Sequence, residues 1–398
     1  MVFDRLLLVN DRTMGFVRKP KIALVGSRGI PPRYGGAETF VYELSKRLRD
    51  FFDVYVTCET EHIGVDVFEG VKRVHIWARH TPTTTIPAIY DVIATLYLLK
   101  KVRDIDVIYY VAPDGAYASI LAKLAKKRVI VNTDGIEWRR LLVRMRFTPW
   151  HLKPLYLLTS VPMFVAEFLA CKVPDVTIAD SIAIEKYLEQ RWRPKRAEYI
   201  AYGVRKLPHV DEAKRIEILK KLGLERDRYY LTIGRIVAEN NIHLEIEAFK
   251  EAKTDSKLVI VGPIDPRDPY VKYLFKLKGK DKRIVFTGGI YEPETIYTLR
   301  AECRAYIHPY TVGGTNPSLL EQLQFSKPII AYDVPFHREI LKNEAIYFKT
   351  KEELTKIIED LEKQNTIRVY REIPHIFTWE WVADRYRKIF ESLVLLRR

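Results

Sequence analysis

The chain has 398 residues, of which 47% are hydrophobic, and a formal net charge of +15. This length is too great for one ordinary hydrophobic core and predicts two globular domains. Cys58, Cys171 and Cys303 are far apart and form no CxxC pair, which argues against a disulfide framework or a zinc site. We therefore expect three free, buried thiols in a cytoplasmic protein. Residues 1–20 hold one short apolar run and no small-residue cleavage site, so no secretory signal is expected.

The excess of positive charge could serve nucleic acid, an anionic membrane or an anionic small molecule. No nucleic-acid recognition motif accompanies it, so nucleic acid is not an expected partner. A solvated surface rich in ion pairs, as in heat-adapted proteins, is the alternative. A local basic face is predicted from eight residues, opposed only by Asp134 and Glu137: Lys123, Lys126, Lys127, Arg128, Arg139, Arg140, Arg144 and Arg146.

Short β-rich runs alternate with helical spacing along the chain, and the pattern occurs twice. In the first half the runs are 21–26, 53–58, 106–111, 128–132 and 175–180. After 198–210 they resume at 229–234, 257–262, 283–289, 304–309 and 328–333. This βα alternation predicts an α/β protein with two doubly wound, Rossmann-like domains. We expect an N-terminal extension at 1–20, domains at 21–203 and 204–376, and a final helix at 377–398.

The final helix has an apolar stripe at steps of three and four residues. Its members are Trp379, Val382, Tyr386, Ile389, Leu393 and Leu396. Such a stripe must pack against another part of the protein.

Two unusual loops follow predicted strands, "GSRGIPPRYGGAETF" at 26–40 and "HPYTVGGTNPSLLE" at 308–321. Ligands of open α/β sheets bind outside the carboxyl ends of the strands, so both loops are expected to line a cleft between the domains. In the first loop Gly35 and Gly36 precede a helix whose buried face is marked by Phe40, Leu44 and Leu48. GxGxxG is absent, which disfavours an ordinary dinucleotide-binding dehydrogenase.

The second loop predicts a helix that starts at Asn316. Gly313 and Gly314 allow a positive φ and close backbone approach, Asn316 is a good N-cap, and proline is tolerated at the next position. The first-turn amides of Ser318 and Leu319 are expected to be free to bind phosphate.

One turn later, Glu321 is placed to accept hydrogen bonds from two hydroxyls, as of a ribose. Arg235, directly after the run 229–234, suits a diphosphate, the alternative being an ion pair with Glu239. Phosphate and diol sites together indicate a nucleotide.

Several segments resemble the retaining GT-B glycosyltransferases of family 4, most of all the rhamnosyltransferase-like subgroup. They are "GSRGIPPRYGGAETFVYEL", "VNTDGIEW", "IADSIAIEKYL", "YYLTIGRIVAENNIHLEIEAF" and "YTVGGTNPSLLEQLQFSKPIIAYDVPFHREIL". The resemblance covers the chain in order from Lys21 to the last helix. It implies a GT-B fold, in which a cleft separates the two domains and the final helix crosses back to the first.

The resemblance also implies a nucleotide-diphosphate sugar as donor, bound mainly by the C-terminal domain, and a glycan or lipid-linked acceptor bound mainly by the N-terminal domain. Glu321 matches the ribose-binding glutamate, Arg235 the diphosphate arginine, and Gly35 and Gly36 the glycine loop beside the phosphates. The full set expected at the donor is Gly35, Gly36, Arg235, Asn240, Gly313, Gly314, Thr315, Asn316, Ser318, Leu319 and Glu321.

Three positions depart from the family pattern. Gly313 stands where many relatives have a sugar-binding glutamate, Asn240 where a lysine often follows the arginine, and Asp134 where many have a histidine near the sugar 6-hydroxyl. Recognition of the sugar must therefore differ, and a 6-deoxy sugar such as rhamnose would need no contact at the histidine's position.

Catalysis in such a retaining transfer depends on holding the reactants and on stabilising the leaving diphosphate. We expect Arg235, Glu321 and Asp134 to act in it. The acceptor or sugar side is assigned to Asp134, Glu137, Arg33 and Tyr34. No cofactor and no metal are expected, since no DxD pair lies in a suitable loop.

The stretch 154–174 is apolar but is interrupted by Pro162 and Glu167, so a membrane span is not expected. We interpret it as a core helix, with an interfacial helix as the alternative. In the second case, and with the basic face, the protein would contact anionic lipid at the inner face of the cell membrane.

Other functions remain open at this level. A GT-B sugar-nucleotide epimerase would use the same nucleotide site without an acceptor. A non-catalytic scaffold would bind no donor, and a nucleic-acid-binding protein would show steeply salt-dependent binding.

Overall fold

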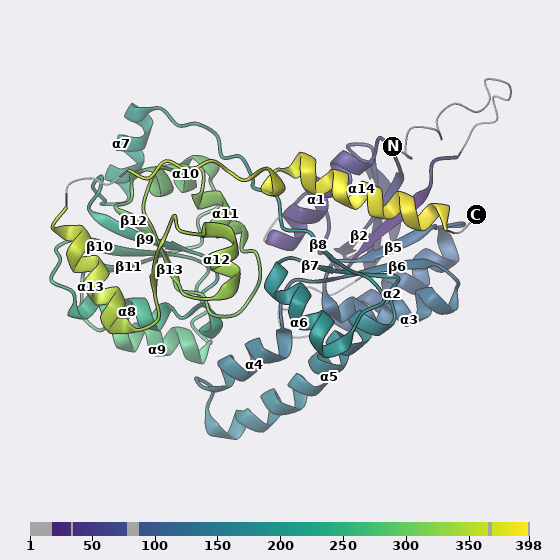
Figure 1. The fold of residues 1–398 in the computed structure, drawn as a ribbon, viewed down its shortest axis with the longest axis horizontal. Helices are drawn as coiled ribbons and strands as arrows, with labels where there is room; N and C mark the ends of the chain where they lie inside the picture. The colour runs from purple at the N-terminus through teal and green to yellow at the C-terminus, as the bar shows by residue number, and fades with distance from the viewer. Residues whose placement is uncertain (1–17, 33–34, 78–86, 365–367, 397–398) are drawn as a thin grey trace.

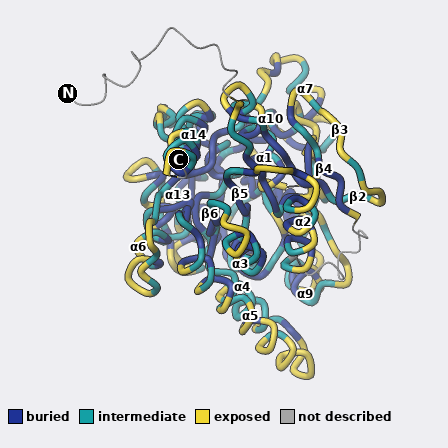
Figure 2. The backbone as a smooth tube through the Cα atoms, turned by 90° about the vertical axis from the view of Figure 1, so that its right-hand side faces the viewer, coloured by how far each residue is buried: buried dark blue, intermediate teal, exposed yellow. Residues whose placement is uncertain are grey.

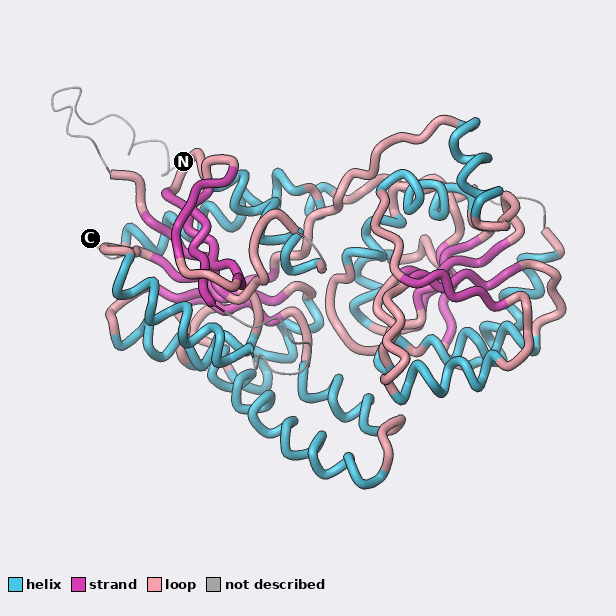
Figure 3. Tube along the Cα trace, turned by 180° about the vertical axis from the view of Figure 1, so that it is seen from behind, coloured by secondary structure: helices cyan, strands magenta, loops and turns pink. Residues whose placement is uncertain are grey.

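The computed structural model describes residues 18–32, 35–77, 87–364 and 368–396. They form two α/β domains, each built on a twisted sheet with helices on both faces (Figures 1 and 3). The expected fold class, two doubly wound Rossmann-like domains, is confirmed.

The N-terminal sheet has eight strands in the order β3-β4-β2-β1-β5-β6-β7-β8, and β3 runs antiparallel to β4. The strands are β1 (Lys21–Val25), β2 (Asp53–Thr60), β3 (Gly64–Phe68), β4 (Val71–Trp77), β5 (Val107–Tyr110), β6 (Arg128–Thr133), β7 (Val176–Ala179) and β8 (Ala197–Tyr199). The helices are α1 (Gly36–Leu48), α2 (Pro87–Lys101), α3 (Ala116–Leu124), α4 (Glu137–Met145), α5 (Lys153–Lys172) and α6 (Ile182–Trp192).

The C-terminal sheet has six parallel strands in the order β11-β10-β9-β12-β13-β14. The strands are β9 (Tyr229–Ile233), β10 (Lys257–Val261), β11 (Ile284–Gly288), β12 (Ala305–His308), β13 (Ile329–Tyr332) and β14 (Ile346–Phe348). The helices are α7 (Glu212–Lys221), α8 (Ile242–Glu251), α9 (Pro269–Lys278), α10 (Pro293–Glu302), α11 (Pro317–Gln322), α12 (Pro335–Leu341), α13 (Lys351–Glu362) and α14 (Trp379–Leu395).

The order of strands reverses direction between β1 and β5 in the first sheet and between β9 and β12 in the second. At such a switch point the following loops diverge to opposite faces and leave a crevice in which ligands bind. The loop after β1 and the loop after β12 are the two that the sequence singled out. Each therefore begins at a switch point.

All ten predicted strands are present, as β1, β2, β5, β6, β7 and β9 to β13. Four further strands were missed. β8 and β14 have three residues each, too few for a pattern, and β3 is an edge strand with a largely exposed surface. The link from β8 to α7 contains the predicted boundary at residues 203 and 204.

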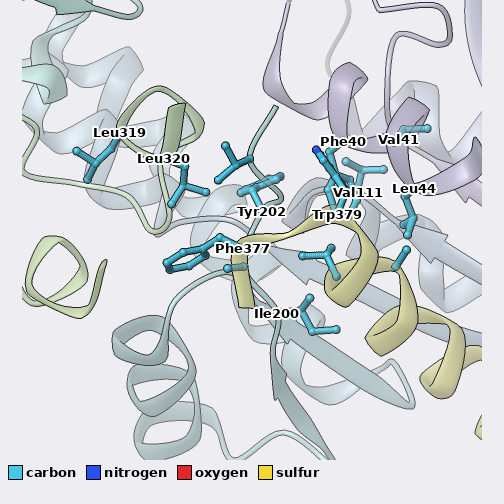
Figure 4. Packing of buried hydrophobic residues seen from close by; sticks show 14 of the residues in the cluster. Phe40, Val41, Leu44, Val111, Ile200, Tyr202, Leu319, Leu320, Phe377 and Trp379 are labelled. Carbon is cyan, nitrogen blue, oxygen red and sulfur yellow. The ribbon is translucent and has the colours of Figure 1, made fainter. Parts of the chain in front are cut away.

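α14 crosses from the C-terminal domain to the N-terminal domain and packs beside α1 (Figures 1 and 4). The hydroxyls of Tyr386 and Tyr109 are 3.3 Å apart, and the ring of Phe390 lies 5.7 Å from that of Phe52. The predicted stripe is buried from Trp379 to Leu393. The prediction was wrong for its last member, Leu396, because the helix stops at Leu395 and Leu396 is 67% exposed.

α4 and α5 form a helical hairpin that projects below the two domains (Figure 1). Its far end is exposed (Figure 2). The interpretation of 154–174 as a core helix is contradicted, because the side chains of Leu155, Leu157, Leu158 and Val161 are all more than half exposed. Apart from Ser160, the buried residues of α5 begin at Ala166.

The predicted basic face between Lys123 and Arg146 is not continuous. Lys123 and Arg128 both pair with Asp175, while Arg140 pairs with Glu137 and Arg144 with Glu239. Four of the eight cations are therefore paired with carboxylates, and for Lys123, Arg128 and Arg144 the partner is distant in the sequence. The three cysteines are free and buried, as predicted.

Gly203 in the interdomain link is required by the packing of α14. A Cβ at this position would lie 2.3 Å from the indole of Trp379. We therefore expect Gly203→Ala to displace the indole and lower the free energy of unfolding by about 2–3 kcal/mol, as overpacking does. Thermal or chemical denaturation measures this loss. Gly64→Ala is the matched control, because its new methyl group would meet no atom closer than 4.0 Å; equal stability of the two variants would contradict the role assigned to Gly203.

Candidate functional site

A pocket of about 330 Å³ lies between the domains, where the two predicted loops meet. A Cβ on Gly36 at the start of α1 would be 3.5 Å from the ring of Pro317 at the start of α11. The pocket is lined by Pro32, Gly35, Gly36, Thr39, Phe40, Tyr202, Gly203, Arg205, Ile233, Ile290, Tyr291, Ile296, Arg300, Pro317, Ser318, Glu321 and Trp379. Its volume is in the range of small-molecule sites.

At the start of α11 the N-cap and the proline are where the sequence predicted them, but the amide groups are not free. Asn316 is the N-cap and Pro317 the first helical residue. The amides expected to bind phosphate are already used: the N–H of Ser318 donates to the side chain of Asn316 at 2.9 Å, and that of Leu319 donates to its carbonyl at 3.0 Å. Leu319 itself is fully buried. A good N-cap satisfies the very groups that a phosphate would need, so this part of the prediction was wrong.

The N-terminus of α1 is different. Gly35 is its N-cap and has no side chain that could cap the helix, and a Cβ there would meet no atom within 4 Å. α1 has 13 residues, so its aligned peptide dipoles add to the uncapped amides. Of the two helix ends at this pocket, that of α1 is therefore the one whose N-cap residue makes no side-chain hydrogen bond to the helix among the described residues.

Gly313 and Gly314, which follow β12, are required for different reasons: the first has a positive φ and the second makes a close contact. Gly313 has φ +144°, which favours glycine. A Cβ on Gly314 would lie 1.8 Å from the carboxyl of Asp180 at the end of β7. The hydroxyl of Thr315 donates to the carbonyl of Asp180. Gly314 and Thr315, predicted as donor-binding residues, hold the two domains together in this structure.

Glu321 is held by two arginines. Arg300 donates to its Oε2 at 3.0 Å, and Nε of Arg205 lies 3.2 Å from its Oε1. Arg300 is fully buried and also donates to Ser318 at 2.9 Å and to Gln322 at 3.1 Å. A carboxylate has about four acceptor positions, so two remain for other donors.

Arg235 projects from the end of β9 and is exposed. Within the described part of the chain it forms no ion pair, because Glu239 is taken by Arg144 at 2.9 Å. The predicted alternative, an Arg235–Glu239 pair, is therefore wrong. Burial raises the pKa of Glu137, whereas the pKa of Glu239 is lowered, against its burial, chiefly by Arg144. Arg235 exerts a smaller, favourable electrostatic effect on both carboxylates, so it lies near groups of both domains. Asn240 donates its side-chain amide to the carbonyl of Arg235 at 2.7 Å and so braces this loop.

Asp134 and Glu137 lie at the same interface, beside Arg140. The guanidinium of Arg140 donates to Glu137 and, at 3.2 Å, to the carbonyl of Asp134. It also lies near the glycine loop, since a Cβ on Gly313 would be 3.6 Å from it. The cluster therefore faces the position that a side chain at 313 would occupy. Arg33 and Tyr34 lie outside the described residues.

Sequence reasoning missed Arg205, Arg300, Arg140 and Asp180. Arg300 lies in the last turn of α10, and nothing in its neighbourhood along the chain distinguishes it from a surface arginine. Asp180 stands at the end of a predicted strand, the one signal that could have placed it at the cleft. In the described ranges no group of three or more His, Cys, Asp or Glu side chains is arranged to hold a metal ion.

Removal of the Glu321 carboxylate is expected to destabilise the protein. Glu321→Ala leaves the buried guanidinium of Arg300 without its counter-charge, which costs about 3 kcal/mol of unfolding free energy. Glu321→Gln keeps an acceptor for Arg300 and is expected to lose less than half as much. Chemical denaturation of both variants tests this, and equal losses would show that charge at residue 321 does not matter to the fold.

In comparisons with known proteins, the two domains of the chain match two different family models. Residues 19–205 match a domain of unknown function, DUF1972, and residues 214–373 match the family Glycosyl transferases group 1. Alpha-D-kanosaminyltransferase of Streptomyces kanamyceticus is 29% identical over 126 residues, 31% of this chain and 32% of that protein. O-antigen chain mannosyltransferase RfbU of Salmonella typhimurium is 27% identical over 130 residues, 32% of this chain and 36% of that protein. The chain thus spans about a third of each curated relative.

Solved structures resemble nearly the whole chain. Anabaena Alr3699/HepE in complex with UDP and glucose aligns over 94% of this chain and 100% of that chain, with a TM-score of 0.71 and 17% identity. Sucrose-phosphate synthase of Thermosynechococcus elongatus aligns over 95% and 100%, with a TM-score of 0.72 and 15% identity. The chain therefore has the GT-B fold, and residues 214–373 of its C-terminal domain match the Glycosyl transferases group 1 family.

Proposed function

We propose that the protein is a glycosyltransferase that moves a hexose or deoxyhexose from a nucleotide-diphosphate sugar to a glycan or lipid-linked saccharide, with retention of anomeric configuration. The observation that carries the proposal is the interdomain pocket, which joins Glu321 of the Glycosyl transferases group 1 domain to the uncapped N-terminus of α1. Anabaena Alr3699/HepE, of the same fold, has been solved with UDP and glucose.

The nucleoside would lie in the C-terminal half of the pocket. Ile290, Tyr291 and Ile296 supply an apolar wall suited to a base. Glu321 would accept hydrogen bonds from the two ribose hydroxyls through the lone pairs that Arg205 and Arg300 leave unused.

The diphosphate would lie between Arg235 and the first amides of α1. Arg235 supplies a positive charge that no described carboxylate neutralises directly, and α1 supplies N–H donors with the positive end of its dipole. The sequence predicted phosphate binding at the N-terminus of α11. We propose that the phosphate binds at the N-terminus of α1 instead. Neither group needs a metal or a cofactor, and we propose a reaction without one.

The donor sugar would face Gly313, Asp134 and Glu137, next to Arg140. As the bond from the sugar to the diphosphate breaks, negative charge grows on the leaving oxygen and positive charge on the ring. Arg235 would stabilise the first and the carboxylates of Asp134 and Glu137 the second. The acceptor hydroxyl would approach on the same face as the leaving group, and its proton would pass to the departing diphosphate.

The two alternative functions differ from the transferase in the molecules that they bind or convert. A sugar-nucleotide epimerase would change the donor sugar with no acceptor present, and a non-catalytic scaffold would bind no nucleotide. Product analysis with donor alone therefore separates the epimerase from the transferase.

We expect UDP, GDP or dTDP, or a sugar conjugate of one of them, to bind the full chain and raise its Tm. Arg235→Ala removes one charge-assisted contact and Glu321→Gln weakens the ribose contact, so each is expected to raise Kd by about 10- to 100-fold. Calorimetric titration measures both. Arg267→Ala is the control, because Arg267 is exposed on the C-terminal domain and pairs locally with Asp265. Failure of every nucleotide to bind would overturn the proposed function.

We also propose that the α4–α5 hairpin contacts an anionic membrane at the cytoplasmic face. Among the described helices, Trp150–Lys172 is the one segment long and apolar enough to cross a bilayer. Only 28% of its most apolar window is buried within the protein. Trp150 is 82% exposed, and Arg146 and Lys153 near it are exposed cations. An apolar surface bordered by cations suits the headgroup region of anionic lipid rather than water.

The hairpin also reaches the donor domain. Arg144 pairs with Glu239, and the ring of Phe147 lies 4.7 Å from that of Tyr270 and 5.3 Å from that of Tyr273. A membrane-bound hairpin would therefore hold both domains at the surface from which a lipid-linked acceptor enters.

Flotation with vesicles of phosphatidylglycerol and phosphatidylcholine at low salt tests this contact. Wild type is expected to float, and Leu158→Glu to bind at least about 10-fold more weakly, because burial of one leucine contributes about 1.5–3 kcal/mol. Ile216→Glu is the control, since this exposed residue lies on α7, on the far side of the molecule (Figure 1). Wild type that stays with the soluble fraction would refute the membrane contact.

A further inference from the structure

Glu321 differs from an ordinary pocket carboxylate because each of its two oxygens already has an arginine beside it. Arg300 donates to Oε2 at 3.0 Å, and Nε of Arg205 lies 3.2 Å from Oε1. All three residues line the interdomain pocket. The side chain of Glu321 is only 15% exposed, so solvent and salt screen these ion pairs weakly. The carboxylate proposed to bind the nucleoside sugar is therefore charge-paired before any ligand arrives.

Arg300 holds Oε2 from α10 and does not depend on a ligand. It is fully buried and also donates to Ser318 and Gln322, which lie on the same short helix as Glu321. Its guanidinium lies 5.3 Å from the centre of the ring of Tyr306. Three hydrogen bonds to one helix fix the planar guanidinium in a single orientation. Oε2 is thus occupied on one side whatever the pocket contains.

Arg205 reaches Oε1 from the link between the domains. Its carbonyl accepts a hydrogen bond from the side-chain amide of Gln324 at 2.9 Å, and the same amide group donates to the carbonyl of Glu321 at 3.2 Å. One residue earlier, the amide of Val204 donates to the carbonyl of Phe377. The main chain at Arg205 is therefore tied to the end of α11 and to the segment before α14, while its side chain, 40% exposed, stands at the wall of the pocket.

This pairing changes what a missing sugar hydroxyl costs. Removal of a ligand hydroxyl from an otherwise unpaired, desolvated carboxylate oxygen lowers affinity by about 10- to 100-fold, because the oxygen is left without any donor. At Glu321 the cation of Arg205 remains beside Oε1 and that of Arg300 beside Oε2. One sugar hydroxyl is then enough to anchor the nucleoside, and a second hydroxyl contributes little.

We infer that Arg205 is a specificity-determining residue that replaces one of the two sugar hydroxyls as a partner of Glu321, so that the site accepts deoxyribonucleoside diphosphate sugars as well as ribonucleoside diphosphate sugars. The inference rests on the proposed function and names the class of donor that the site admits. Without Arg205, Oε1 would depend on the second hydroxyl, and the site would select ribose over deoxyribose.

Calorimetric titration of the full chain with UDP, 2′-deoxyUDP and 2′,3′-dideoxyUDP tests the inference, with the matching guanine series measured beside it. In wild type we expect 2′-deoxyUDP to bind within about 3-fold of UDP, and the dideoxy compound at least about 10-fold more weakly than UDP. A preference of 10-fold or more for UDP over 2′-deoxyUDP, flagged here as about the loss of one charge-assisted hydrogen bond, would overturn the inference. Equal binding of all three compounds would also overturn it, because Glu321 would then not contact the sugar.

A variant assigns the effect to Arg205. Arg205→Met keeps an unbranched side chain without the charge and is expected to raise the ratio of the two Kd values, 2′-deoxyUDP over UDP, to at least about 10. The ratio is taken within one protein, so a general loss of stability or affinity cancels. Arg226→Met is the matched control, because Nε of Arg226 pairs with Glu302 at 2.6 Å and its side chain is 44% exposed, but it lies outside the residues that line the pocket. An unchanged ratio in Arg205→Met, or an equal rise in the control, would contradict the role of Arg205.

The same titrations separate this inference from the proposed function. Failure of every compound in both series to bind would overturn the proposed function and the role of Arg205 with it. Binding of UDP or GDP with the wrong order of affinities within its series would overturn the role of Arg205 alone.

Discussion

The packing of α14 against the N-terminal domain is the constraint on which the cleft depends. Trp379 lies against the link at Gly203, and Phe40 and Tyr202 pack nearby (Figure 4). The hydroxyls of Tyr109 and Tyr386 also meet between the sheet and α14. The chain therefore passes between the domains twice, and the amide of Val204 donates to the carbonyl of Phe377 where the two passages meet. Two passages that are joined at this point limit how far the domains can separate.

Charge is distributed unequally across that cleft. Arg205, Arg235 and Arg300 are on the side of the C-terminal domain and the link, next to the uncapped end of α1. On the side of the N-terminal domain, Asp134 and Glu137 lie at the interface beside Arg140. This arrangement suits an anionic donor bound mainly on the side of the C-terminal domain.

The motif at the start of α11 shows which structural features a short sequence can predict. "NPSLLE" correctly predicted the cap, the proline and the carboxylate of α11, because these depend on neighbours within four residues. It predicted phosphate-binding amides wrongly, since the same cap occupies them. The hairpin α4–α5 is similar: its composition suits a core helix, and only its projection away from both sheets leaves Leu157 and Leu158 in solvent.

The sequence by itself determined the two parallel sheets, ten of their strands, the loops at the switch points and the final helix. These follow from local periodicity and from glycine and proline positions, which act over a few residues. Tertiary structure alone decided that Arg300 and Arg205 hold Glu321 and that Arg144 rather than Arg235 pairs with Glu239. Such contacts join residues up to about a hundred positions apart, and side chains so distant leave no periodic trace in the chain.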